Sequence, residues 1–235
     1  MAATIQVYVW DLPTRLFHWL LAAAIPAALV TGFLGGELIV WHGRLGLLIL
    51  GLLVFRLAWG FVGSSNARFA RFVRGPAAIA AYLRGEWRGH GHNPLGALAV
   101  LTMLGLIAIQ VGSGLFANDD IAFRGPLADL VGDELSSRLT SLHAVSQYLL
   151  IAMVVLHAAA IAYYVRRRRH TLIRPMVSGY RSASADDVVD GAPAGPARIA
   201  LAFVLSALLA VFSVYAATGA LVHAAPVATA PTPSW

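Results

Sequence analysis

The sequence predicts an all-α integral membrane protein, made of a four-helix bundle and a fifth, carboxyl-terminal transmembrane helix. Two observations support this fold class. The 235 residues are 59% hydrophobic and only 12% charged, with a mean hydropathy of +0.73, whereas a soluble globular domain carries about 25% charged residues. The apolar residues also gather in five stretches, and each stretch reaches the roughly 20 residues that a helix needs to cross a bilayer.

The five predicted spans lie near residues 14–34, 42–63, 94–116, 141–165 and 197–222. The first span resembles a secretory signal peptide only in its position. Its apolar part is long, and the residues that precede and open it are Asp11 and Arg15 rather than a basic run, so we expect it to remain as a helix. Pro26 within it is tolerable, because neighbouring helices can satisfy the freed backbone groups.

Loop charge predicts the orientation. All 17 basic residues are arginines, and they concentrate after the second and fourth spans, whereas the loop over 117–140 holds five acids. Because arginine-rich loops stay on the cytoplasmic side, the amino terminus is predicted inside and the carboxyl terminus in the periplasm of a bacterial inner membrane. The predicted units are a four-helix core over 1–177, a cytoplasmic linker over 178–196, the fifth helix over 197–222 and a periplasmic tail over 223–235.

Residue types restrict the possible cofactors and partners. The chain has no cysteine, which excludes disulfides, thiolate-bound iron–sulfur clusters and haem attached through cysteine. A metal cofactor must therefore bind through histidine, methionine or carboxylate. The basic excess follows the membrane loops, so it indicates membrane lipid rather than nucleic acid as a partner.

Four of the eight histidines fall within or at the ends of predicted spans, and they sort by depth. His18 lies at the inner end of the first span and His42 at the outer start of the second. His143 and His157 lie 14 residues apart on the fourth span, nearly four helical turns, so both point the same way, roughly 21 Å apart. The depths pair His18 with His157 and His42 with His143.

Paired imidazoles from facing helices suit two haem irons, one inner and one outer. A proton relay or a divalent-metal path built from the same histidines are the alternatives, and both would favour carboxylates, which the spans lack. Arg56 lies 14 residues after His42, on the same face and near the depth of His18 and His157. It is predicted either to bind haem propionates or to extend to the inner lipid headgroups.

Four motifs carry a family resemblance: "RLFHW", "WHGRLGLLILGLLVFRLAWG", "HNPLGALAVLTMLGLIAIQVGSGLF" and the stretch from "LHAVSQY" to "LIRPMVSGY". Over about residues 5–180 they resemble the prokaryotic cytochrome b561 and nickel-hydrogenase b-type cytochrome family. The resemblance implies two non-covalent haems b with His18, His42, His143 and His157 as axial ligands. It also implies electron transfer between membrane quinone and a redox partner. The fifth helix departs from the four-helix pattern of smaller, quinol-oxidising members, which leaves the partner open.

Three functions remain at this point. The first is an electron-transfer subunit that connects the quinone pool to a periplasmic c-type cytochrome or a hydrogenase-like enzyme. The second is a stand-alone quinol oxidase that passes electrons to a small acceptor such as superoxide, and the third is a histidine-lined transporter. The fifth helix could dock a partner or form a homodimer contact. Loop residues His90, His92 and His170 are candidate proton acceptors for quinone chemistry on the inner side.

Overall fold

The computed structural model describes residues 4–86, 94–121, 123–167, 171–184 and 195–221. Five helices in this part of the chain are long and apolar enough to cross a membrane. They are α1 (Leu12–Leu34), α2 (Ile39–Val62), α5 (Pro94–Leu115), α6 (Asp133–Arg167) and α8 (Pro196–Ala217). The predicted all-α class and the five spans are confirmed. Helix α6 begins eight residues before the predicted 141–165, because its first turns are polar and extend above the apolar stretch.

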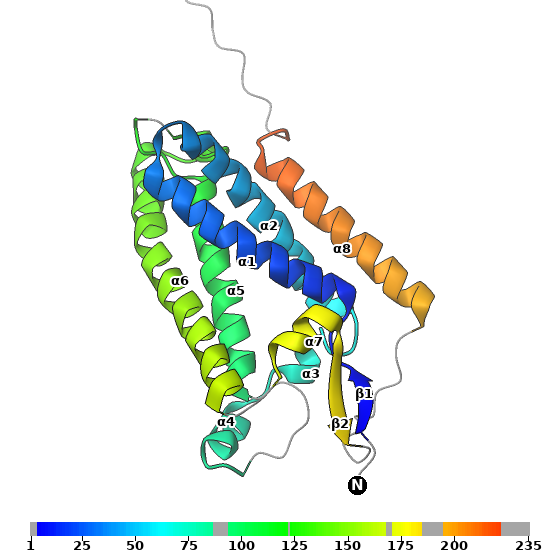
Figure 1. Ribbon diagram of the computed structural model, residues 1–235. Helices are drawn as coiled ribbons and strands as arrows, with labels where there is room; N and C mark the ends of the chain where they lie inside the picture. Colours follow the sequence, from blue (N-terminus) through cyan, green and yellow to red (C-terminus); the bar gives the residue numbers. More distant parts are fainter. Residues whose placement is uncertain (1–3, 87–93, 122, 168–170, 185–194, 222–235) are drawn as a thin grey trace, which may run out of the picture.

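The four core helices form two closely packed pairs. Helix α1 lies along α2 and α5 lies along α6, while α2 and α5 join the pairs more sparsely (Figure 1). Apolar side chains from all four helices meet between the pairs, among them Phe17, Leu53, Leu104 and Leu150. Both predicted ligand pairs therefore cross from the first helix pair to the second.

Helix α8 packs along α2, on the side away from α5 and α6 (Figure 1). Trp59 of α2 is fully buried there, and its ring lies edge-on to Phe203 at 6.3 Å between centroids. Phe55 stacks on Trp59 and also contacts Phe203. Small residues such as Ala202 let the two backbones approach. The fifth helix is thus a packed part of the bundle.

A small platform lies at the end of the bundle that carries the amino terminus. Strand β1 (Thr4–Tyr8) pairs antiparallel with β2 (Tyr180–Ser184). The short helices α3 (Phe69–Phe72), α4 (Pro76–Leu83) and α7 (Ile173–Ser178) lie at the same end of the bundle, with α7 beside β2. The linker predicted over 178–196 therefore begins with a strand, because β1 satisfies its backbone hydrogen bonds. The candidate proton acceptors His90, His92 and His170 lie outside the described residues.

At the opposite end of the bundle, a tight turn connects α5 to the 3₁₀ helix η2 (Ala128–Leu130). Asn118 and Arg124 form an isolated antiparallel bridge. The carboxylate of Asp119 accepts the backbone N–H groups of Ile121 and Phe123. This turn directs the Phe123 ring onto His42 of α2, with 6.2 Å between ring centroids.

Candidate cofactor site

His42 and His143 face each other at the outer end of the bundle. His42 is held by α2 and His143 by α6, so each helix pair contributes one imidazole. The ring centroids lie 5.9 Å apart and the ring planes are nearly perpendicular, at 87°. The structure therefore brings together the outer pair that the sequence predicted from depth alone.

Backbone carbonyls fix the orientation of both rings. Nδ1 of His42 lies 2.8 Å from the Ala28 oxygen of α1, and Nδ1 of His143 lies 2.8 Å from the Gln110 oxygen of α5. A carbonyl oxygen only accepts hydrogen bonds, so each Nδ1 carries the proton and donates it. The Nε2 lone pair of each ring is then free, which is the arrangement that metal-binding histidines adopt.

Two glycines make room for these rings. A Cβ atom added to Gly32 of α1 would lie 2.8 Å from His42 Nδ1, and one added to Gly114 of α5 would lie 2.8 Å from His143 Cε1. Sequence reasoning missed both glycines. The reason is that the ring beside each glycine belongs to another helix, and the sequence does not show which helices are neighbours.

Gln110 organises the polar contacts around His143. Its side-chain amide donates to the main-chain oxygen of His143 at 3.1 Å, and its side-chain oxygen accepts from the Ser146 hydroxyl at 2.5 Å. A polar side chain within an apolar span is uncommon and joins helices by hydrogen bonds. That polarity was the available signal for Gln110, and sequence reasoning did not use it.

The geometry of the outer pair fits two imidazole ligands of one metal centre. Two metal–imidazole bonds of about 2 Å in line place the ring centroids roughly 6 Å apart, close to the observed 5.9 Å. Imidazole nitrogen is a suitable donor for iron. Helix α6 also buries only Ser136, Ser146 and Leu150 among its described residues, so protein atoms cover little of the helix that carries both His143 and His157. A haem between the helix pairs fits these residues.

The inner pair is His18 of α1 and His157 of α6. The two rings are close enough to interact electrostatically. Nδ1 of His18 is buried and has no hydrogen-bond partner among the described residues, which leaves it available to a group that the protein itself does not provide. The ring of His18 lies edge-on to Trp19 at 5.0 Å, and the Trp19 indole donates to the Met176 oxygen at 3.1 Å.

Arg56 is buried near the inner end of α2, with 5% of its surface exposed. Its guanidinium carbon lies 4.9 Å from the centre of the Phe69 ring, and Asp11 is the nearby charge that acts on it. One guanidinium nitrogen, Nη1, is buried without a partner in the described chain. The side chain therefore does not extend to the surface, and it retains a donor for an anionic group.

Asp11 joins the start of α1 to the end of α2. Its carboxylate accepts the backbone N–H of Thr14 at 2.7 Å, as the N-cap of α1. It also accepts the Trp59 indole N–H at 3.1 Å and the Ser64 hydroxyl. Sequence reasoning noted Asp11 only as a non-basic residue before the first span, because its partners on α2 and beyond, Trp59 and Ser64, are more than forty positions away.

The comparisons with known proteins agree with this arrangement. The family model of prokaryotic cytochrome b561 matches residues 9–179. A probable Ni/Fe-hydrogenase B-type cytochrome subunit of Rhodobacter capsulatus is 25% identical over 220 residues, covering 78% of this chain and 84% of the relative. The corresponding proteins of Azotobacter vinelandii and Escherichia coli K12 are 28% and 24% identical, covering 77% and 74% of this chain and 90% of each relative.

No solved structure matches the chain significantly. The family match covers α1, α2, α5 and α6 and ends just before β2, so it includes all four histidines and leaves α8 outside. Together with the five membrane spans, these findings establish that the chain belongs to the prokaryotic cytochrome b561 family and is a multi-pass membrane b-type cytochrome of electron transport.

Proposed function

We propose that this cytochrome holds two haems b and transfers electrons between the quinone pool and a redox partner on the periplasmic side of a bacterial inner membrane. His18 and His157 would hold the inner haem, and His42 and His143 the outer one. The observation that carries the proposal is the outer pair: two imidazoles 5.9 Å apart, each with Nδ1 directed to a carbonyl of another helix.

Bound haem supplies reversible one-electron chemistry at its iron. The protein residues would hold two such centres in series, since His143 and His157 lie on one face of α6, roughly 21 Å apart along its axis. With two histidines holding each iron, the haems would relay electrons and would not act on a bound substrate. We assign the spare guanidinium donor of Arg56 to an anionic haem propionate, on the grounds of its burial and unpartnered Nη1.

The fixed imidazoles argue against the transporter alternative. A histidine that relays protons must exchange the proton on both ring nitrogens. In His42 and His143, Nδ1 is bonded to a backbone carbonyl that cannot return a proton. This favours ligands over a proton path.

For the partner, we propose a hydrogenase-like enzyme on the outer side, because the matched relatives are described as hydrogenase cytochrome subunits. A periplasmic c-type cytochrome, superoxide as a small acceptor, and a homodimer formed through the exposed face of α8 remain the competing proposals.

The decisive experiment is a haem count. We expect about two haems b per chain by pyridine haemochrome analysis of the purified protein. His157→Ala and His143→Ala should each retain about one haem. The two variants should lose different components of the reduced-minus-oxidised spectrum. The loop variant His90→Ala is the matched control and should retain both. A single haem per chain, or loss of both from each variant, would contradict the paired assignment.

The electron donor and acceptor are tested in vesicles that contain the purified protein. A reduced quinone analogue added to the membrane should reduce the haems within the time of mixing, and an outer partner should then reoxidise them. Reoxidation by superoxide at the same rate would favour the stand-alone oxidase. Failure of quinol to reduce either haem would remove quinone from the proposal and leave haem binding intact.

A further inference from the structure

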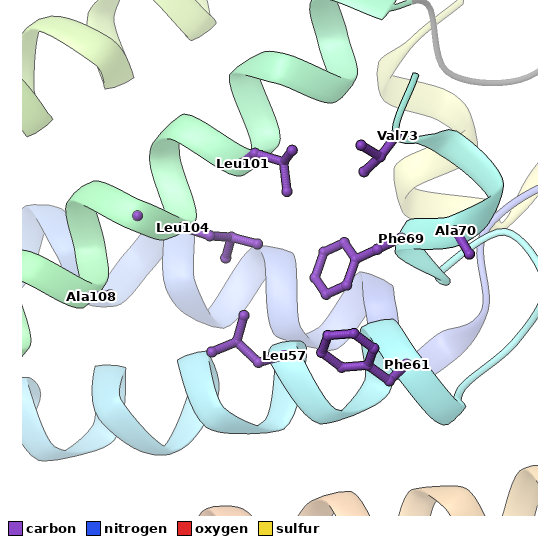
Figure 2. Close-up of a pocket in the computed structure, with 9 residues that line it drawn as sticks. Leu57, Phe61, Phe69, Ala70, Val73, Leu101, Leu104 and Ala108 are labelled. Carbon is purple, nitrogen blue, oxygen red and sulfur yellow. The ribbon is translucent and has the colours of Figure 1, made fainter. Parts of the chain in front are cut away.

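An apolar pocket of about 630 Å³ opens on the side of the bundle near its inner end. Helices α2, α3 and α5 form its walls, as Figure 2 shows. Its volume lies in the range of about 300–1,000 Å³ that is typical of small-molecule sites. The lining includes Leu57, Phe61, Phe69, Leu101, Leu104 and Gly105, all without polar side-chain atoms.

The α3 wall of this pocket is held firmly by the bundle. Phe69 packs between the pocket and Arg56, whose guanidinium carbon lies 4.9 Å from the ring centre. The ring also contacts Phe61 at 5.4 Å and Phe72 at 5.7 Å between centroids. It rests against Gly60, where a Cβ atom would collide with it. The pocket is therefore a feature of the packed fold.

Three arginines lie in α3 or directly beside it, and α3 forms one wall of the pocket. Arg68 and Arg71 flank Phe69 and Ala70, which line the pocket, and Arg74 follows Val73, which also lines it. The sequence has no acidic residue from 63 to 85. Arg71 and Arg74 are exposed, and neither makes an ion pair within the described part of the chain. Nε of Arg68 is buried without a partner in that same part.

We propose that this pocket and its arginines form a binding site for one anionic phospholipid of the inner leaflet. The apolar pocket would take an acyl chain, and Arg68, Arg71 and Arg74 would bind the phosphate headgroup. Charge complementarity supports this ligand, because a basic patch beside an apolar groove at the cytoplasmic surface selects anionic headgroups. The site is separate from the four histidines, and the proposal goes beyond electron transfer.

The test compares lipids on the purified, haem-loaded full chain by native mass spectrometry. Phosphatidylglycerol and phosphatidylcholine with identical acyl chains are added separately after complete removal of endogenous lipid. We expect one phosphatidylglycerol to be retained at least tenfold more strongly. The double variant R71Q/R74Q should lose this preference, by about fivefold for each arginine. Both residues are exposed, and the haem spectrum verifies that the variant is folded.

Matched variants separate this site from general surface effects. R84Q removes an inner arginine that is paired with Glu86 instead, and it should leave retention unchanged. G105F fills the pocket from a position whose added Cβ meets nothing within 4 Å, and it should abolish retention. Its control L208F lies on an exposed face of α8, away from the pocket, and should have no effect. If G105F does not fold, A108F probes the same lining.

Three results would overturn the proposal. The first is equal retention of the two lipids, and the second is a loss in R84Q as large as that in R71Q/R74Q. The third is retention of an endogenous isoprenoid quinone that resists R71Q/R74Q and that phosphatidylglycerol does not displace. The last result would assign the pocket to a neutral ligand. None of them alters the haem count, so failure here and failure of the proposed electron transfer are distinguishable.

Discussion

Gln110 binds His143 through both its main chain and its side chain. Its carbonyl oxygen lies 2.8 Å from the imidazole Nδ1, while its side-chain amide donates to the His143 backbone oxygen at 3.1 Å. Gln110 of α5 thus sets both the orientation of the His143 ring and the position of α6 along α5. A change of the side chain alone separates these two roles, because the carbonyl remains.

Gln110→Leu should loosen α6 without removing the bond to Nδ1. Interhelical hydrogen bonds in membranes contribute about 0.6 kcal/mol on average, so the loss of two should cost about 1 kcal/mol. We expect a lower unfolding temperature and faster loss of the outer haem in detergent, both followed by absorbance. Gln147→Leu is the control, since among the described residues the amide of Gln147 bonds only within its own helix. Equal effects of the two variants would contradict a special role for Gln110.

Gly114→Ala should displace the outer ligand. The new methyl group would lie 2.8 Å from Cε1 of His143, closer than real Cβ contacts, and overpacking of this kind costs about 1–3 kcal/mol. We expect the haem content to fall toward one per chain, with the inner component of the spectrum retained. Gly112→Ala on the same helix meets nothing within 4 Å and should keep full occupancy. Full occupancy in Gly114→Ala would show that the ring has room to move.

Phe123→Ala should lower the reduction potential of the outer haem. Phe123 packs on His42 from the outer turn, and its removal admits water, which stabilises the more charged oxidised iron. A potentiometric titration should show the shift in one of the two components only. Ile121→Ala provides the comparison, because Ile121 is 93% exposed on the same turn. An unchanged potential in Phe123→Ala would mean that other groups shield the site.

Asp11→Ala should be the most destabilising of these substitutions. It removes the N-cap of α1, worth about 1 kcal/mol, and leaves the buried Trp59 N–H without its acceptor, which costs about 1–3 kcal/mol. We expect a loss of about 2–4 kcal/mol, seen as a lower unfolding temperature. Asp11→Asn keeps a capping oxygen and should lose less. The exposed Asp133→Ala should be close to neutral, and a similar loss there would contradict the argument.

Hydropathy was sufficient to predict the membrane helices, because each span had to bury about twenty consecutive apolar residues in lipid. The predicted 94–116 span, for example, agrees with α5 within one residue. The short helix α3 was not predicted, since four residues are too few to show a helical period. Strands β1 and β2 were also missed, because each is stabilised only by a partner more than 170 residues away.

The candidate site was predictable to a similar extent. Depth along the spans predicted that His42 faces His143, and the structure brings these residues together; their role as iron ligands stays a prediction. The contacts that orient the rings were beyond sequence reasoning. Which carbonyl meets Nδ1 of His42, or which ring Gly114 accommodates, depends on the rotation of neighbouring helices. A single sequence specifies periodicity and depth, and it does not specify that rotation.

The pairing of β1 with β2 has a consequence for biosynthesis. Strand β1 is made first, but Tyr8 cannot meet Tyr180 until the four membrane-spanning helices α1, α2, α5 and α6 have been translated. At about 5–20 residues per second, the amino-terminal strand waits on the order of ten to thirty seconds. An unpaired strand edge invites pairing with other chains during that time. His157 precedes β2 along the chain, so every candidate ligand has left the ribosome before the sheet closes, and closure marks the completion of the core.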